Sequence, residues 1–262
     1  MVVTGEPAAA GDVDRRTVIW HQLECGEYTA DMPLWRELAA RSRASGSGGP
    51  ILDVGAGAGR VALELARAGH EVTALDIDAV LLGELRSLAG DLGVETVCAD
   101  AREFALARRD YALCLAPMQT VQLLGGSDGR IAFMRRAREH LRPGGVLACA
   151  IATDLEPFDC RGGGPSPSPE VTHADGLLYV SRAVRVVLTR RAARIERERS
   201  IRHDEDGGGR ALHTELDVID LDLVSVARLH REGRSAGLAP AGTRMVGETE
   251  EHVGSTVVML RA

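Results

Sequence analysis

The stretch from Ile51 to Arg60 constrains the fold of this chain more than any other part of it. Its sequence is Ile-Leu-Asp-Val-Gly-Ala-Gly-Ala-Gly-Arg, and its first four residues predict a short buried strand. Three glycines at every second position then predict a tight turn, and a helix is predicted from Arg60 to Ala68. Glycine lets a ligand approach the backbone because it has no Cβ, and a helix start offers free N–H groups. The stretch therefore predicts a cradle for a ligand.

The spacing of the glycines separates this cradle from that of dinucleotide-binding proteins. The chain has Gly-x-Gly-x-Gly, whereas the dinucleotide fingerprint Gly-x-Gly-x-x-Gly would need its third glycine at Arg60. Asp53 lies just before the turn, where a carboxylate can order the N–H groups of the loop and attract a cationic part of a ligand. An oxidoreductase that binds a dinucleotide is therefore disfavoured.

Strands and helices alternate along the chain from this stretch onward. After the first strand, further strands are predicted over 71–75, 94–98, 111–116 and 146–152. Helices are predicted over 60–68, 79–92 and 128–141. This alternation predicts the α/β class with a doubly wound parallel sheet, and the apolar strands fit a sheet covered on both faces.

The pattern becomes antiparallel after Thr153. A loop over 157–169 is followed by predicted strands over 177–189, 193–203 and 210–220, although the second, rich in Arg and Glu, could also be helical. The turn signal from Asp204 to Gly209 predicts a hairpin of the last two. One face of this sheet is predicted to be buried, through Leu178, Val180, Val184, Val186 and Leu188 on the first strand and Leu212, Thr214, Leu216 and Val218 on the third. A helix over 223–235 and strands over 238–246 and 255–260 complete the chain.

Composition limits the partners of the protein. A net charge of −7 over 262 residues argues against a nucleic-acid binder. We find no apolar run long enough for a transmembrane helix and no signal-peptide pattern, so no membrane partner is expected. The five cysteines form no Cys-x-x-Cys pair, and His173, His203 and His213 have no metal-ligand spacing, so no metal site is expected. These features predict a reduced cytoplasmic protein, and the complete absence of Lys favours a bacterial source of high G+C content.

Polar residues follow the next strands of the predicted sheet. In an open α/β sheet, ligands bind at the carboxyl ends of the strands. Asp76 ends the second strand, where a carboxylate can accept from both hydroxyls of a ribose, and Asp100 ends the third, where it can accept from an adenine amino group. Ala116 and Pro117 end the fourth strand and predict a floor for the ligand. A helix N-cap is the alternative role for Asp76 and Asp100.

These residues together resemble the class I S-adenosylmethionine-dependent methyltransferases. The first motif of that family is similar to 52–59, its ribose acid to Asp76, its adenine-side acid to Asp100, and its Leu-x-Pro-Gly-Gly turn to 141–145. The resemblance implies a Rossmann-like, seven-stranded sheet with the last strand reversed, and S-adenosylmethionine as cofactor. It implies cofactor contacts at Asp53, Gly55, Ala56, Gly57, Asp76, Ile77, Asp100, Ala101, Ala116 and Pro117.

The remaining segments are assigned around this core. Residues 1–47 are predicted to form an N-terminal helical lid, with Asp31 as the N-cap of its second helix and Trp35 in the core. Residues 48–153 form the α/β core, 154–222 an antiparallel insertion, and 223–262 the helix and strands that complete the core. The insertion is similar to that of glycine/sarcosine and amino-sugar N-methyltransferases, which implies a substrate cover or a homodimer contact.

The resemblance predicts methyl transfer to an N or O atom of a small-molecule acceptor, with alignment of the reacting atoms as the dominant contribution. In many such enzymes a Tyr before the first strand approaches the methyl or the carboxylate, which here would be Tyr28. Gln119 and Gln122 would border the reactive end, with packing as their alternative, and one of the three histidines above could act as a base. Arg60 is expected to be a first-turn surface residue, with contact to a carboxylate as the alternative. A non-catalytic module that binds the cofactor is the second interpretation.

Overall fold

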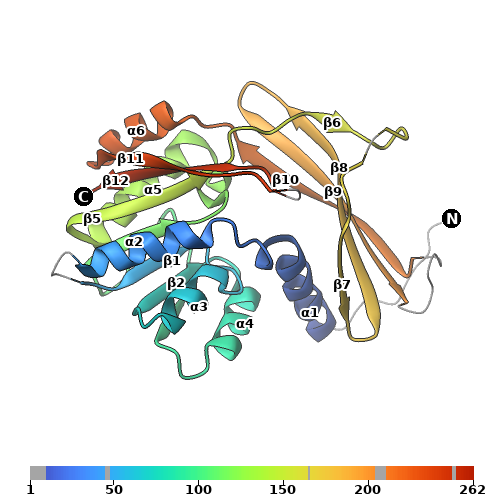
Figure 1. Ribbon diagram of the computed structural model, residues 1–262, viewed down its shortest axis with the longest axis horizontal. Coiled ribbons are helices and arrows are strands. Elements are labelled where there is room, and N and C mark those ends of the chain that lie inside the picture. The colour runs from blue at the N-terminus through green and yellow to red at the C-terminus, as the bar shows by residue number, and fades with distance from the viewer. Residues whose placement is uncertain (1–9, 45–47, 165, 204–210, 250–251) are drawn as a thin grey trace.

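The computed structural model describes residues 10–44, 48–164, 166–203, 211–249 and 252–262 (Figure 1). Within these residues, one sheet has seven strands in the order β11-β12-β5-β4-β1-β2-β3, and a second, antiparallel sheet contains β6 to β10. The α/β core with a reversed strand and an antiparallel insertion is therefore confirmed. None of the described helices has the length and apolar composition of a membrane span.

The large sheet is parallel except for one strand. Its parallel strands are paired in order from β3 to β5, and β12 runs antiparallel between β5 and β11. Because the parallel strands end at one edge, the residues that follow β1, β2, β3 and β4 come together there. The bounds are β1 Ile51–Val54, β2 Val72–Asp76, β3 Val94–Cys98, β4 Tyr111–Ala116, β5 Leu141–Ile151, β11 Ala239–Val246 and β12 Ser255–Arg261.

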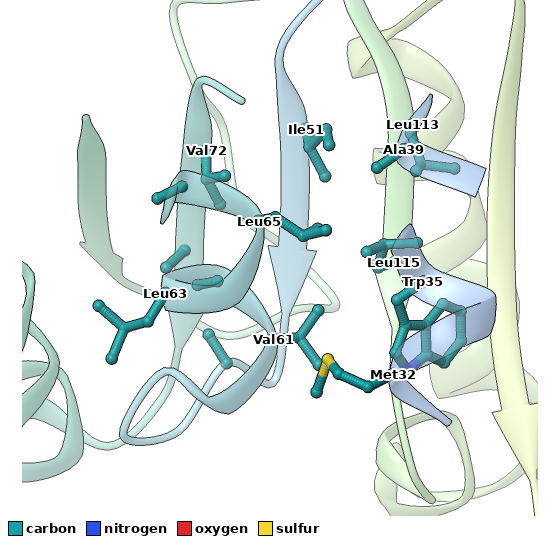
Figure 2. Close-up of a cluster of buried hydrophobic side chains, with 14 of the residues drawn as sticks. Met32, Trp35, Ala39, Ile51, Val61, Leu63, Leu65, Val72, Leu113 and Leu115 are labelled. Atoms are coloured by element: carbon teal, nitrogen blue, oxygen red, sulfur yellow. The ribbon is translucent and has the colours of Figure 1, made fainter. Parts of the chain in front are cut away.

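Helices cover both faces of this sheet. Ile51 and Leu113 point to a core shared with α2 Met32–Ala44, α3 Arg60–Arg67 and α4 Ala79–Ala89, in which Trp35 is fully buried (Figure 2). The next residues along the same strands, Leu52 and Cys114, point to the opposite core, under α5 Gly126–His140 and α6 Val226–Ser235. This alternation has the period of two that a strand requires. Each predicted helix of the core is present, and α4 ends three residues earlier than the predicted end at Leu92.

The second sheet is larger than the sequence predicted. Its bounds are β6 Phe158–Asp159, β7 Glu170–Ala174, β8 Leu177–Leu188, β9 Ala192–His203 and β10 His213–Asp222. The short β6 lies inside the predicted loop, and β7 follows that loop, so two strands were missed. The segment that could have been helical is the central strand β9, paired on both sides. The predicted turn from Asp204 to Gly209 lies outside the described residues.

The predicted buried face of this sheet is correct for Val184 and Val186 in β8, but it is wrong in the first half of β8 and in β10. A bulge between Ala183 and Arg185 shifts the register of β8, so that Tyr179 is buried before it and Val186 after it. The two residues have opposite parity in the sequence, because one extra residue reverses the faces of a strand. In β10 the predicted apolar face points to solvent, since Leu216 is 57% exposed and Val218 is 46% exposed.

The N-terminal segment packs between α4 and the second sheet. It consists of α1 Ala10–His21 and a π-helical turn, η1 Gln22–Gly26. Trp20 and Leu23 form a small core with Tyr179 of β8 and Ile201 of β9, and the Trp20 and Tyr179 rings meet edge to face at 5.0 Å. Figure 1 shows α1 between α4 and this sheet. The predicted lid is therefore joined to the insertion.

Candidate active site at the carboxyl edge of the sheet

The glycine turn after β1 is held to the end of β2. Gly57 lies in the left-handed region with φ 53°, which favours glycine, and its N–H donates a 2.8 Å hydrogen bond to Oδ2 of Asp76. Oδ1 of Asp76 accepts from the Asp78 N–H at 2.9 Å. The N-cap of α4 is Asp78, whose side chain accepts from Val80 and Leu81, so the alternative N-cap role for Asp76 is not observed. A carboxylate oxygen has two acceptor sites, so each Asp76 oxygen keeps one for a ligand.

Asp53 is a buried carboxyl group with no side-chain partner among the described residues. Its side chain is fully buried, and neither carboxylate oxygen has a hydrogen-bond partner among the described residues. Burial, opposed by the Arg60 guanidinium and reinforced by the Asp76 carboxylate, raises the pKa of Asp53 to about 7. A carboxyl group in this state costs folding free energy when it ionises, and a bound cation nearby would favour its charged form.

The end of β3 is occupied by an exposed ion pair. Asp100 accepts hydrogen bonds from the Arg102 backbone N–H at 2.8 Å and from the Arg102 guanidinium, which hold the pKa of this carboxyl below its usual value. The side chain therefore forms a local turn, and an adenine amino group would compete with Arg102. Ile77, between the two acidic strand ends, is 70% exposed. An apolar side chain open to solvent at this edge offers a surface for a flat ring.

The turn after β4 packs on the turn after β1. Pro117 accepts hydrogen bonds from the Thr120 N–H and hydroxyl, and Met118 has a φ of 52°, which is uncommon for a residue other than glycine. A Cβ on Gly55 would lie 2.5 Å from Oγ1 of Thr120. The structure therefore brings the predicted floor, at Ala116 and Pro117, next to the glycine turn.

Arg60 is not the surface residue that the sequence predicted. Its side chain is 11% exposed and forms a two-pronged ion pair with Asp31, at 2.6 and 2.8 Å. Asp31 is 1% exposed and also accepts from the indole N–H of Trp35 at 2.7 Å. Its carbonyl accepts from the Trp35 N–H at the start of α2, as at an N-cap, while its carboxylate joins α2 to α3. The pair orders the start of α3 against the lid.

Tyr28 is buried beside this pair. Its carbonyl accepts from Nη1 of Arg60 at 2.7 Å, and the guanidinium carbon lies 5.2 Å from the phenol ring centroid. The His252 ring stacks against Tyr28 with a centroid distance of 4.8 Å. Burial raises the pKa of the Tyr28 hydroxyl, which therefore stays protonated at neutral pH. With 7% of its surface exposed, Tyr28 is not a surface residue.

The two predicted glutamines differ in their surroundings. Gln122, in the 3₁₀-helix η2 Thr120–Leu123, is 1% exposed. Its amide donates to the carbonyls of Ala152 and Asp222 and accepts from the Ala152 N–H at 2.7 Å. These bonds join η2 to the ends of β5 and β10, which is the packing alternative. Gln119 precedes η2 and is half-buried.

No motif of the sequence indicated His21, which lies at the end of α1. A Cβ on Gly57 would overlap the His21 imidazole, so this ring lies directly on the glycine turn. His21 and Arg60 line one cavity of about 540 Å³ beneath α1, together with His173 of β7. Only the proximity of α1 to the turn could have revealed it, and that proximity depends on the packing of Trp20 against the insertion. His203 and His213 lie exposed on the second sheet.

Comparisons with known proteins agree with a ligand site at these strand ends. Residues 51–145 match a family model described as a methyltransferase domain. This stretch is therefore similar to a methyltransferase domain. The matched range contains the glycine turn, Asp76 and Asp100. No curated protein matches the chain in sequence.

Solved structures share the fold of this chain over nearly its whole length. An S-adenosylmethionine-dependent methyltransferase from Clostridium acetobutylicum has a TM-score of 0.68 and 12% identity, covering 95% of this chain and 98% of that one. An amino pentose methyltransferase from Micromonospora echinaspora, solved with S-adenosylmethionine, has a TM-score of 0.64 and 19% identity with 100% coverage of both. A sugar N-methyltransferase from a Streptoalloteichus species has a TM-score of 0.65 and 18% identity, covering 100% and 97%.

Proposed function

We propose that the protein transfers the methyl group of S-adenosylmethionine to a nitrogen of a small molecule. Bound S-adenosylmethionine supplies an electrophilic methyl group on a positively charged sulfur. The methyltransferase domain over 51–145 supports this activity, and two neighbours of the same fold are named as an amino pentose methyltransferase and a sugar N-methyltransferase. The observation that carries the proposal is the glycine turn bound to Asp76 beside the unpaired carboxylate of Asp53.

The residues at the strand ends fit this cofactor. The free acceptor sites of Asp76 suit two ribose hydroxyls, and Ile77 offers an apolar surface to the adenine ring. Asp53 lies beneath the turn without an ion-pair partner among the described residues, and a further cationic group nearby would stabilise its ionised form. We propose that the predicted residues bind the cofactor: Asp53, Gly55, Ala56, Gly57, Asp76, Ile77, Asp100, Ala101, Ala116 and Pro117.

The acceptor side is proposed to lie between Tyr28, Gln119 and the second sheet. The Tyr28 hydroxyl keeps its proton at neutral pH, so it can donate a hydrogen bond but is a poor base. An amine reaches the site with its own lone pair, whereas a hydroxyl acceptor would need a base to remove its proton. We therefore favour an amine. We propose an anchoring role for Gln122 and keep Tyr28 and Gln119 as acceptor contacts.

Alignment is the main contribution that we assign to the protein. Holding two reactants in line can supply about 7–11 kcal/mol of the barrier without acid–base catalysis. We propose that the antiparallel insertion, joined to α1 by the core around Trp20, covers the acceptor and excludes water. In this proposal the N-terminal lid and the insertion together cover the acceptor.

Turnover with a panel of amines and alcohols tests the proposal. Purified protein is incubated with S-adenosylmethionine and each acceptor, and S-adenosylhomocysteine is measured by mass spectrometry. We expect product with amino sugars or other small amines, and none with the Asp76→Ala variant. Binding of S-adenosylmethionine without turnover of any acceptor would favour the non-catalytic module. Product with alcohols alone would overturn the amine assignment.

A further inference from the structure

His21 and Arg60 lie at one end of the glycine turn, and neither belongs to the assigned cofactor set. The His21 ring contacts the Gly57 backbone, and both side chains line the cavity of about 540 Å³ beneath α1. Ala58, which connects Gly57 to the start of α3, lines the same cavity. Two side chains that can carry positive charge therefore face one space beside the cradle.

The glycine turn has opposite charges at its two ends. Asp53 precedes the turn with a carboxylate that has no hydrogen-bond partner among the described residues, and Arg60 follows it. The Arg60 guanidinium carries five N–H groups, and three of them donate hydrogen bonds to Tyr28 and Asp31. Its Nε–H and one Nη2–H remain for a ligand. An α-amino acid group, with an ammonium and a carboxylate on neighbouring atoms, matches this arrangement of charge.

We propose that His21 and Arg60 bind the carboxylate at the amino-acid end of the cofactor, and that His21 takes up a proton from solvent when this carboxylate binds. The inference deepens the proposed function and depends on it. It assigns His21 a binding role that the motifs of the sequence did not indicate. The step is a proton transfer: an N–H bond forms on the imidazole, and the hydronium ion or buffer acid in the solvent loses the proton.

The surroundings of His21 explain the proton uptake. Burial lowers the pKa of its imidazole, and Nδ1 is buried without a hydrogen-bond partner among the described residues. The charged groups around it are Asp76 at the end of β2, Asp78 before α4, Glu24 in η1 and Arg60 in α3.

The nearby carboxylates have partners of their own. Asp76 and Asp78 accept from backbone amides, and Glu24 is paired with Arg199 at 2.6 Å. Arg15, Glu27 and His173 line the same cavity. A carboxylate bound between His21 and Arg60 adds a negative charge that favours the imidazolium form.

Calorimetric titration with two ligands tests the proposal. S-Adenosylhomocysteine carries the amino-acid end, and 5′-methylthioadenosine keeps the adenosine and sulfur but lacks it. Each is titrated into the wild type, His21→Gln and His21→Phe at pH 7.5, in two buffers of different ionisation enthalpy, so that proton uptake is measured directly. His21→Phe keeps a ring against Gly57 and separates loss of the proton site from loss of packing. His173→Gln, in the same cavity, is the matched control.

We expect both His21 variants to bind S-adenosylhomocysteine about tenfold more weakly, because a hydrogen bond to a charged group is lost. Proton uptake should disappear in both, while the affinity for 5′-methylthioadenosine stays within about twofold of wild type. The His173→Gln control should keep proton uptake. Equal weakening of both ligands would show a packing role and overturn the proposal, as would unchanged proton uptake in the variants. If neither ligand binds the wild type, the proposed function itself fails, which is a different result.

Discussion

The backbone N–H of Gly57 donates a 2.8 Å hydrogen bond to Oδ2 of Asp76. This bond joins the turn after β1 to the end of β2, so two parts of the cradle that lie apart in the sequence are held together before any ligand binds. Because the second oxygen of Asp76 is held by the Asp78 N–H, the carboxylate has a fixed orientation. A fixed acceptor needs less ordering when a ribose binds.

Removal of the Asp76 carboxylate should abolish cofactor binding. Asp76→Ala removes the acceptor for ribose hydroxyls and the bond that shapes the turn. We expect S-adenosylhomocysteine to raise the Tm of the wild type and to leave that of the variant unchanged. Asp78→Ala is the matched control, since it removes the N-cap of α4, costs about 1 kcal/mol of stability and keeps the shift. A full shift in Asp76→Ala would remove the ribose assignment.

The carboxyl of Asp53 should make stability depend on pH. Its pKa is raised from 3.8 to about 7 in the folded state, so the folded protein holds a proton that the unfolded chain has released. The free energy of unfolding therefore falls as pH rises between about 4 and 7, and levels off above that. Asp53→Asn removes this loss and should be more stable than wild type at pH 8, by up to about 4 kcal/mol. Urea unfolding at pH 5 and pH 8 measures the difference.

The same variant should bind the cofactor more weakly. An amide at this position has no negative charge to offer a cation, so Asp53→Asn should lose affinity for S-adenosylmethionine more than for neutral adenosine. A variant that is more stable at pH 8 and weaker in binding would show a carboxylate kept for function at a cost in stability. A variant less stable than wild type at pH 8 contradicts the unpaired state of Asp53.

The ion pair of Arg60 and Asp31 should be necessary for the lid to pack. Because Asp31 is 1% exposed, Asp31→Ala leaves the guanidinium without its partner and should cost about 3–5 kcal/mol in urea unfolding. The exposed pair of Arg36 and Glu64 lies on α2 and α3, and Arg36→Ala should cost less than about 1 kcal/mol. Similar losses in the two variants would mean that burial of the first pair has no energetic consequence.

The two glutamines at η2 should separate stability from acceptor binding. Gln122→Ala leaves buried groups of Ala152 without partners, and should cost about 2–4 kcal/mol with little change in acceptor KM. Gln119→Ala should raise KM for the acceptor and leave Tm near that of the wild type. The reverse pattern, with KM raised in Gln122→Ala alone, would return Gln122 to the acceptor site.

The sequence predicted the core well because its signals there are local. The glycine turn, the acidic strand ends and the apolar runs each depend on residues close in the chain, and β1 and β4 begin and end at the predicted residues. The observed bounds of helices and strands differ from the predicted ones where local sequence signals conflict. The Leu141–Gly145 segment is part of β5, and the pairing of β5 with β4 shifts in register there. Residue propensities do not indicate such a shift.

The remaining parts depend on contacts between distant segments. The faces of β8 reverse at a bulge, and a periodic pattern cannot show where an extra residue is accommodated. Arg60 was expected at the surface because its partner Asp31 lies far from it in the sequence. His21 reaches Gly57 because Trp20 packs on Tyr179, which follows it by more than a hundred residues. Such contacts become visible only when the lid, core and insertion are assembled.

The identity of the cofactor is tested most directly by the thermal stability of the wild type with S-adenosylmethionine, S-adenosylhomocysteine and NAD at equal concentration. Ligands that bind only the folded protein raise its Tm. We predict that both S-adenosyl compounds raise the Tm and that NAD leaves it unchanged. A rise with NAD, and none with the other two, would contradict the assignment of the glycine turn and Asp76 to S-adenosylmethionine.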